Sequence, residues 1–415
     1  MLRRFFDAKS LMFGIDKNCA SAVHINLIGT KQCREEEKMK KKIIGILLTA
    51  VTTLALTGCG SGAAGAASTT ATSASTAAVV ESSAAVSSAA TVASEAVSAV
   101  KIKAGATYKV GIVQYVDDAS LNQIEKSVEQ ELDAKGKAMN ATFDYSHYTF
   151  NGQADSTVLN QIAAELVNEK VDVIIPIATP TAMIMQTATE DNQIPVVFAA
   201  VSDPVGAGLV KSMDAPGSNI TGTSDALNTK AVFDLMLASN PKIKTVGLLY
   251  NNSEDSSKKP IADAKAYCAA KNIKVVEKTG TTNDEITQAA DALVAAGVNA
   301  VFTPTDNTVM TAELSIYEKF IDAKIPQYAG ADSFALNGAF CGYGVNYAEL
   351  GKSTADMAVE ILGGVKPSGI AVKTVDDGIA TINTDTASAI GADYSKFSGM
   401  CEKVKEVKTA ENFGK

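Results

Sequence analysis

Polar residues follow several apolar, strand-like runs of this sequence, at the points where helical patterns begin. In open α/β sheets ligands bind beyond the carboxyl ends of the strands, so binding chemistry is expected at these positions. The residue types are hydroxyls, amides, carboxylates and phenols, which suit a small polar solute. The candidate ligand-binding residues are Gln114, Tyr115, Thr179, Pro180, Thr181, Ala182, Ser202, Asp203, Tyr250, Asn251, Thr305, Asp306, Asn307 and Asp332.

The segment Thr179–Ala182 has the pattern of a helix start that binds an anion. Thr179 is a good N-cap, and Pro180 suits the first helical position. The N–H groups of Thr181 and Ala182 would then face a cleft, where the partial positive charge of a helix N-terminus suits a carboxylate. The alternative is an ordinary helix cap. Asp203 precedes a proline and either faces the ligand or caps the turn.

Acids in the second half of the chain are candidates for binding an ammonium group, because charge-assisted hydrogen bonds to it are strong. Asp306 and Asp332 follow two strand-like runs, although Asp306 could instead be the N-cap of a helix at Thr308. An aromatic wall made by Tyr115, Tyr250 and Phe334 is a further hypothesis, and its alternative is that these rings belong to the core.

Strands and helices alternate from Tyr108 onward, which predicts two successive β/α units with parallel sheets covered on both faces. Each unit resembles a Rossmann-like lobe. The expected strands of the first unit are Tyr108–Tyr115, Ala141–Tyr148, Val171–Ala178 and Pro195–Val201; those of the second are Thr245–Tyr250, Lys274–Lys278, Ala300–Thr303, Pro326–Ala331 and Cys341–Val345, followed by a long helix over Tyr347–Leu362.

The first hundred residues have the composition of a leader and a tether. Lys40–Lys42 and an apolar run to Leu56 form a signal-peptide pattern that starts at about Met39, and Leu56-Thr57-Gly58-Cys59 resembles the lipobox of bacterial lipoproteins. We therefore expect a leader over 1–58, with lipid on Cys59. Residues 1–38 fit no signal pattern and are either untranslated or a true extension. The Ala/Ser/Thr-rich stretch 59–106 is expected to be a flexible tether.

Charge and cysteine content argue against several other classes of protein. The net charge is −9, and because residues 1–58 hold ten Lys/Arg and five Asp/Glu, it is −14 for the remainder. No basic cluster follows the leader, so no nucleic-acid binding is expected. Cys268, Cys341 and Cys401 lack the spacing of a metal site, and the first two fit a core. We expect no metal, no cofactor and no catalytic residues, because nucleophile–base and dinucleotide motifs are absent.

Eight stretches, in order, resemble the ABC-transporter substrate-binding protein family that includes tryptophan-, tyrosine- and phenylalanine-binding lipoproteins. The resemblance implies two lobes joined by a hinge, the periplasmic-binding-protein fold of type I, with lobe 1 at 107–223, lobe 2 at 224–346, and a return helix to lobe 1 and C-terminal crossing at 347–415. It places crossings near Thr221–Ser224, Gly344–Tyr347 and Ala380–Asp385. The stretches are Tyr108–Val116, Phe150–Leu166, Ile177–Ala188, Pro195–Val210, Asn219–Asp225, Val246–Glu254, Val301–Val309 and Tyr328–Leu350.

The resemblance implies an extracytoplasmic, membrane-anchored receptor that captures an amino acid, aromatic by preference, and delivers it to an ABC permease and its ATPase. A sensor subunit for a receptor kinase would have the same sequence features, and a nucleoside or sugar would suit the same fold. A repressor effector domain would need a DNA-binding helix pair at the N-terminus, where the lipobox and tether stand. A lipid-anchored hydrolase would need a nucleophile–base set.

Overall fold

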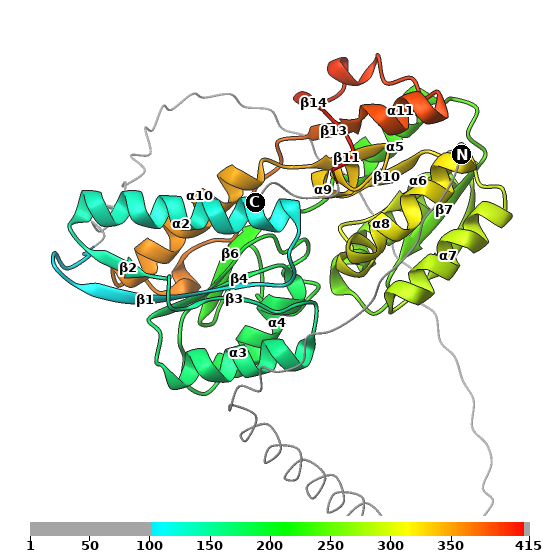
Figure 1. The fold of residues 1–415 in the computed structure, drawn as a ribbon. Helices are drawn as coiled ribbons and strands as arrows, with labels where there is room; N and C mark the ends of the chain where they lie inside the picture. Colours follow the sequence, from blue (N-terminus) through cyan, green and yellow to red (C-terminus); the bar gives the residue numbers. More distant parts are fainter. Residues whose placement is uncertain (1–100, 411–415) are drawn as a thin grey trace, which may run out of the picture. The chain divides into compact units, whose positions relative to one another are not determined.

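The computed structural model describes residues 101–410, so the expected leader, Cys59 and nearly all of the expected tether lie outside the described residues. Two sheets, each flanked by helices, make up this part of the chain (Figure 1). This architecture confirms the expected α/β fold with two lobes, which are called here lobe 1 and lobe 2 after their sheets. No helix within residues 101–410 is long and apolar enough to cross a membrane.

Lobe 1 contains a parallel sheet of order β12-β6-β5-β4-β1-β2, with β3 also paired with β1. Residues of β4 alternate between its faces: Val173 and Ile175 join the core beneath α2 and α10, whereas Ile174 joins the core beneath α3 and α4. The elements are β1 (Thr107–Gln114), α2 (Ala119–Met139), β2 (Thr142–Asp144), β3 (Thr149–Asn151), α3 (Ser156–Asn168), β4 (Val173–Ile177), α4 (Thr179–Thr189), β5 (Val196–Phe198), β6 (Ile220–Ser224), α10 (Tyr347–Leu362), η1 (Pro367–Gly369) and β12 (Lys373–Thr374).

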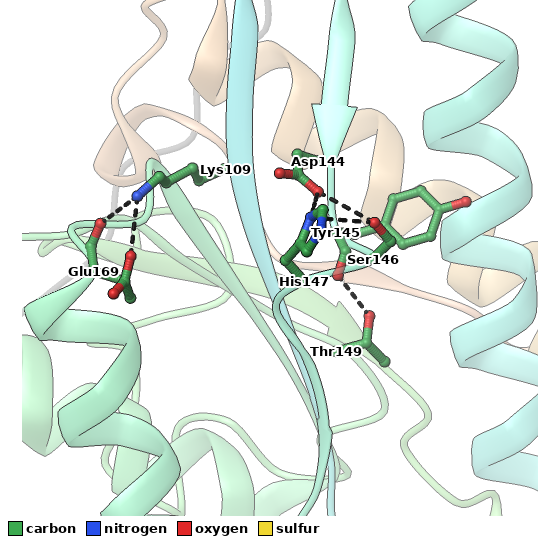
Figure 2. Close-up of polar contacts among 7 residues, drawn as sticks. All are labelled: Lys109, Asp144, Tyr145, Ser146, His147, Thr149 and Glu169. Carbon is green, nitrogen blue, oxygen red and sulfur yellow. Dashed lines mark hydrogen bonds and ion pairs between the residues drawn. The ribbon is translucent and has the colours of Figure 1, made fainter.

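The strand expected over Ala141–Tyr148 is instead two short strands separated by a turn. Thr142 pairs with the start of β1 and Thr149 with its end. In the turn between them, the Asp144 carboxylate lies 2.9 Å from Nδ1 of His147, and the Thr149 hydroxyl donates to the carbonyl of Tyr145 over 3.0 Å (Figure 2). These local hydrogen bonds give the polar groups partners within the turn, as an alternative to the partners of a continuous strand.

Lobe 2 contains a sheet of order β14-β13-β11-β10-β9-β7-β8, in which only the β11–β13 pair is antiparallel. Cys268 and Cys341 are buried in its core, as expected from the sequence. The elements are α5 (Thr229–Ser239), β7 (Thr245–Tyr250), α6 (Asp255–Ala270), β8 (Lys274–Thr279), α7 (Asn283–Ala295), β9 (Ala300–Thr303), α8 (Asn307–Asp322), β10 (Gln327–Ala329), α9 (Asp332–Leu336), β11 (Cys341–Gly344), β13 (Ile379–Asn383), α11 (Thr384–Ile390), η2 (Phe397–Gly399) and β14 (Lys403–Val407).

The chain passes between the two sheets three times. It leaves the first sheet after β6, returns between β11 and α10, which packs on α2 and the first sheet, and leaves again between β12 and β13. The third passage was expected at Ala380–Asp385, but those residues belong to β13 and the start of α11. The passage therefore lies before them in the chain. The two-residue strand β12, which pairs with β6 at Thr223, is too short to give a sequence signal.

A buried acid with no role in the cleft lies between α8 and the second sheet. The side chain of Glu313 is fully buried, and its Oε2 accepts a hydrogen bond from Nε2 of Gln327 over 2.9 Å. Oε1 of Glu313 and Oε1 of Gln327 both lack a partner within the described residues. Burial raises the pKa of Glu313 to about 8, so the folded protein holds a proton here that the unfolded chain loses at about pH 4.3.

Glu313→Gln is expected to stabilise the protein in alkaline solution. The contribution of the protonated Glu313 to stability is full below the unfolded pKa and is lost as the pH rises to about 8. At pH 9 the variant should therefore unfold with a free energy higher by about 2–4 kcal/mol, with little difference at pH 5. Urea unfolding at the two pH values measures this, and Glu318→Gln, exposed on the same helix, is the matched control. An equal gain at both pH values would contradict the titration argument.

Candidate ligand-binding site

A cavity between the two lobes gathers residues from the carboxyl ends of their strands. It encloses about 370 Å³ of space, part of it open to solvent. Five of the residues expected from the sequence line it: Thr179 and Ser202 from lobe 1, and Thr305, Asp306 and Asn307 from lobe 2. The other lining residues are Ser120, Leu121, Ala178, Ala200, Asp225, Ser256, Met310, Ala331 and Tyr347.

The start of α4 presents unsatisfied donors at this cavity. The helix begins at Thr179, one residue before the expected first helical residue Pro180, and the N-cap is Ala178 instead of Thr179; Ala178 has no capping side chain and a φ of 80°. No acceptor within the described residues takes the N–H groups of Thr179 and Thr181, and the buried Thr181 hydroxyl also lacks a partner. The N–H of Ala182, in contrast, donates to the carbonyl of Ala178, so it is not available to a ligand as expected.

Asp225 is a buried acid of the cavity wall that is not among the candidates selected from the sequence. It follows β6 at the first passage between the lobes, and its Oδ1 accepts a hydrogen bond from the Ser202 hydroxyl over 3.0 Å. Burial raises the pKa of Asp225 to about 6, against the opposing effect of that hydrogen bond. Its only sequence signal is its place at the end of the Asn219–Asp225 stretch.

Asp306 is both the N-cap of α8 and a residue of the cavity wall, so the two expectations for it are compatible. Its Oδ1 accepts from the N–H of Val309 over 2.9 Å. Its Oδ2 accepts from the N–H of Asn251 over 2.7 Å and from the Ser257 hydroxyl over 2.6 Å. Beside it lies Glu254, whose carboxylate accepts from the N–H of Asn307. The N–H groups at the start of α8 are thus hydrogen-bonded to Asp306 and Glu254, whereas those at the start of α4 have no acceptor within the described residues.

Asp332 joins the two lobes directly and does not line the cavity. Its Oδ1 accepts from the Ser120 hydroxyl over 2.6 Å, and its Oδ2 lies 3.3 Å from Nε2 of Gln123; both partners belong to α2 of lobe 1. The Ser120 hydroxyl in turn accepts from the N–H of Ser333 over 3.2 Å. Asp306 lines the cavity and Asp332 does not, which favours Asp306 over Asp332 as an acid available to a ligand.

Several expected residues point away from the cavity. Gln114 donates to the carbonyl of Val116 and to Asn122, and Asp203 accepts from the N–H of Gly206 as a turn cap. Tyr250 and Phe334 are core residues, so no aromatic wall contains them. Tyr115 is half-buried, and burial raises its pKa to about 12 with a further effect of Glu254 and Asp306, which places it beside the acids of lobe 2. The remaining two are Pro180, which is half-buried, and Asn251, which is buried and donates from Nδ2 to the Thr308 hydroxyl.

Metal-ligating residue types are not clustered within residues 101–410. No group of three or more His, Cys, Asp or Glu within residues 101–410 is placed to hold a metal ion. His147 lies on the exposed turn beside Asp144 and away from the cavity lining. The cavity presents the free N–H groups at the start of α4 together with several buried carboxylates and hydroxyls. These groups are suited to binding a polar ligand.

Comparison with known proteins agrees with this geometry. Residues 109–397 match the model of the ABC transporter substrate binding protein family. A tyrosine-binding protein of Clostridioides difficile (strain R20291) is 35% identical over 305 residues, which are 73% of this chain and 85% of that protein. The chain belongs to the ABC transporter substrate-binding protein family. Proteins of this family are extracytoplasmic binding components of ABC transporters and not enzymes.

Solved structures show the same family relationship. An ABC domain from Streptococcus pneumonia in complex with L-Trp is 29% identical, with a TM-score of 0.66, and covers 72% of this chain and 99% of its own. A ligand-free, open substrate-binding protein from Clostridium difficile is 35% identical, with a TM-score of 0.57, and covers 73% and 100%. A conserved domain protein from Vibrio cholerae is 31% identical, with a TM-score of 0.66, and covers 72% and 99%.

Proposed function

We propose that this substrate-binding protein captures an aromatic amino acid between its lobes and delivers it to the permease and ATPase of an ABC importer. The observation that carries the proposal is the contrast across the cavity, where an uncovered helix start in lobe 1 faces buried carboxylates in lobe 2. An amino-acid zwitterion has one charge for each side. The relatives that are named for tyrosine or bound to L-Trp support the aromatic side chain.

In this proposal the ligand carboxylate binds the N–H groups of Thr179 and Thr181, where the positive end of the α4 dipole favours an anion. The ammonium group binds the carboxylates of Asp306 and Asp225. Charge-assisted hydrogen bonds of this kind contribute roughly 1.5–3 kcal/mol each. Because each end is held by a different part of the cavity wall, only the intact zwitterion favours the closed arrangement of the lobes.

The lobe arrangement of this structure supports closure around a ligand. The Ser120–Asp332 hydrogen bond joins the lobes beside the cavity. The TM-score is also higher with the L-Trp complex than with the ligand-free, open structure, although the latter is more similar in sequence. We therefore propose that lobes at about 107–223 and 224–346, with the return helix and C-terminal crossing at 347–415, move about the three passages of the chain.

Lipid anchoring is proposed from the sequence alone. The Leu56–Cys59 motif follows a basic, apolar leader, and a tether over 59–106 would separate the lipid on Cys59 from the folded lobes. Mass spectrometry of the membrane fraction should find a mature protein that begins at lipidated Cys59. An unmodified soluble product that still begins at Met1 would contradict this part of the proposal.

A thermal-shift screen tests the ligand class. Amino acids, nucleosides and sugars are each added at saturation, and a ligand that binds only the folded state raises the melting temperature. We expect the largest shifts with tyrosine, tryptophan and phenylalanine. A shift with a nucleoside or sugar and none with any amino acid would show that the proposed ligand class is wrong. The assignment to the family would not change.

A further inference from the structure

Two acids lie side by side, buried behind the lobe 2 wall of the cavity. Both acids bind the first turn of α8, Glu254 through the N–H of Asn307 and Asp306 through the N–H of Val309, and Glu254 is only 8% exposed. The hydrogen-bond partners of the two carboxylates within the described residues are N–H or hydroxyl groups, from Asn307, Asn251, Val309 and Ser257. Neither acid takes part in any ion pair found among the described residues.

Two buried carboxylates in contact cannot both ionise at low cost, because burial and like charge both disfavour the second negative charge. Burial, followed by the nearby charge of Asp306, raises the pKa of Glu254 well above its usual range. Asp306 receives three further hydrogen bonds that favour its ionised form, although burial raises its pKa as well. The stable arrangement is therefore a protonated Glu254 that donates to an ionised Asp306.

The same wall contains an unsatisfied group that points to a ligand. The Ser256 hydroxyl lines the cavity next to Asp306, is 2% exposed and has no hydrogen-bond partner within the described residues. Among the described residues, the lining of the cavity includes no lysine, arginine or histidine. A cationic ligand would supply a positive charge beside the acids.

We propose that Glu254 is a positioning residue that keeps its proton against Asp306 in the empty cleft and releases it to solvent when a cationic group binds at Asp306. This rests on the proposed function, since it requires a ligand with an ammonium group. The proton leaves as the cation arrives, so ligand binding and proton release are linked. In the pH range where the pair changes its protonation, affinity should increase with pH by up to about tenfold per unit.

Other titratable groups near the pair define the competing explanation. After burial, the charges of Glu254, Asp306 and Asp155 raise the pKa of Tyr115 in lobe 1. Asp225 and Tyr347 line the same cavity, and Asp118 and Asp332 lie near Tyr347. Burial raises the pKa of Asp225 to about 6 and that of Asp118 to about 7, so these two acids are the alternative sources of a released proton.

Calorimetry with L-tyrosine in buffers of different ionisation enthalpy measures the released protons directly. Glu254→Gln replaces the proton-bearing oxygen by an amide that still donates to Asp306, so it imitates the protonated acid at every pH. Between about pH 5 and pH 8, the wild type should release up to about one proton per ligand, and this variant should release clearly less while binding within about fivefold of the wild type at low pH. Asp225→Asn should bind more weakly, because it loses a contact with the ammonium group, but it should retain the release at about pH 8, where Asp225 is already ionised in the wild type.

Three results would overturn the proposal. They are a wild type that exchanges no proton on binding L-tyrosine, a Glu254→Gln variant with unchanged proton release, and a release that disappears in Asp225→Asn alone. The first needs no variant, so the proposal can be tested even if a variant fails to fold. A failure of the proposed function is distinguishable from a failure of the proton-release proposal. In the former case no aromatic amino acid would give any binding heat with the wild type.

Discussion

Thr179→Asp is expected to abolish amino-acid binding, with a loss of affinity of about a hundredfold or more. Thr179 is the first residue of α4 and lines the cavity where we propose the ligand carboxylate to bind. An acid in the first turn is favourable for the helix itself, because it complements the helix dipole. The same negative charge repels the ligand carboxylate and occupies its N–H donors.

Thr179→Asn is the matched control, because it has the shape of the aspartate variant without its charge. We expect calorimetry to show L-tyrosine binding within about tenfold of the wild type for this variant. Equal affinity of the aspartate and asparagine variants would show that the ligand carboxylate does not bind at the start of α4. Circular dichroism and thermal unfolding establish that both variants are folded.

The second large effect is expected from Asp306→Asn, which should weaken L-tyrosine binding by about tenfold to a hundredfold. Asparagine is as good an N-cap as aspartate, so α8 should still begin at Asn307. The Ser257 hydroxyl can rotate to accept a hydrogen bond from the new amide, whereas the hydrogen bond from the N–H of Asn251 is lost. The variant therefore removes the charge that we assign to the ammonium group, keeps the N-cap of α8 and loses one backbone hydrogen bond.

Asp332→Asn is the control for this variant. Its amide oxygen can still accept from the Ser120 hydroxyl, so the interlobe contact persists, and we expect an affinity within about threefold of the wild type. Calorimetry on the two variants under one set of conditions compares them. A larger loss for Asp332→Asn than for Asp306→Asn would assign the ammonium group to Asp332 instead.

The sequence predicted the fold well because its signals are local and repeated. Continuous apolar runs such as Val173–Ile177 identify strands buried on both faces, and most boundaries lie within a few residues of those expected. The prediction of a single strand over Ala141–Tyr148 was wrong, because hydrogen bonds of Ser146 and His147 with Asp144 form a turn. The spacing of apolar residues does not reveal such a turn.

The site was less predictable because it depends on where side chains point. Position at a strand end was enough to select Thr179, Ser202 and Asp306, which line the cavity, but Tyr250 also ends a strand and belongs to the core. Asp225 and Glu254 are acids whose importance appears only when burial is known. A sequence gives no measure of burial for a single carboxylate in a loop, so neither was selected.

The central claim is that the cavity binds both charged ends of an aromatic amino acid. Calorimetry with L-tyrosine, with tyramine, which lacks the carboxylate, and with 3-(4-hydroxyphenyl)propionate, which lacks the ammonium group, tests it most directly. We predict that L-tyrosine binds and that each truncated ligand binds at least about tenfold more weakly. Binding of either truncated ligand as tightly as L-tyrosine, or the absence of binding by tyrosine, tryptophan and phenylalanine alike, would contradict it.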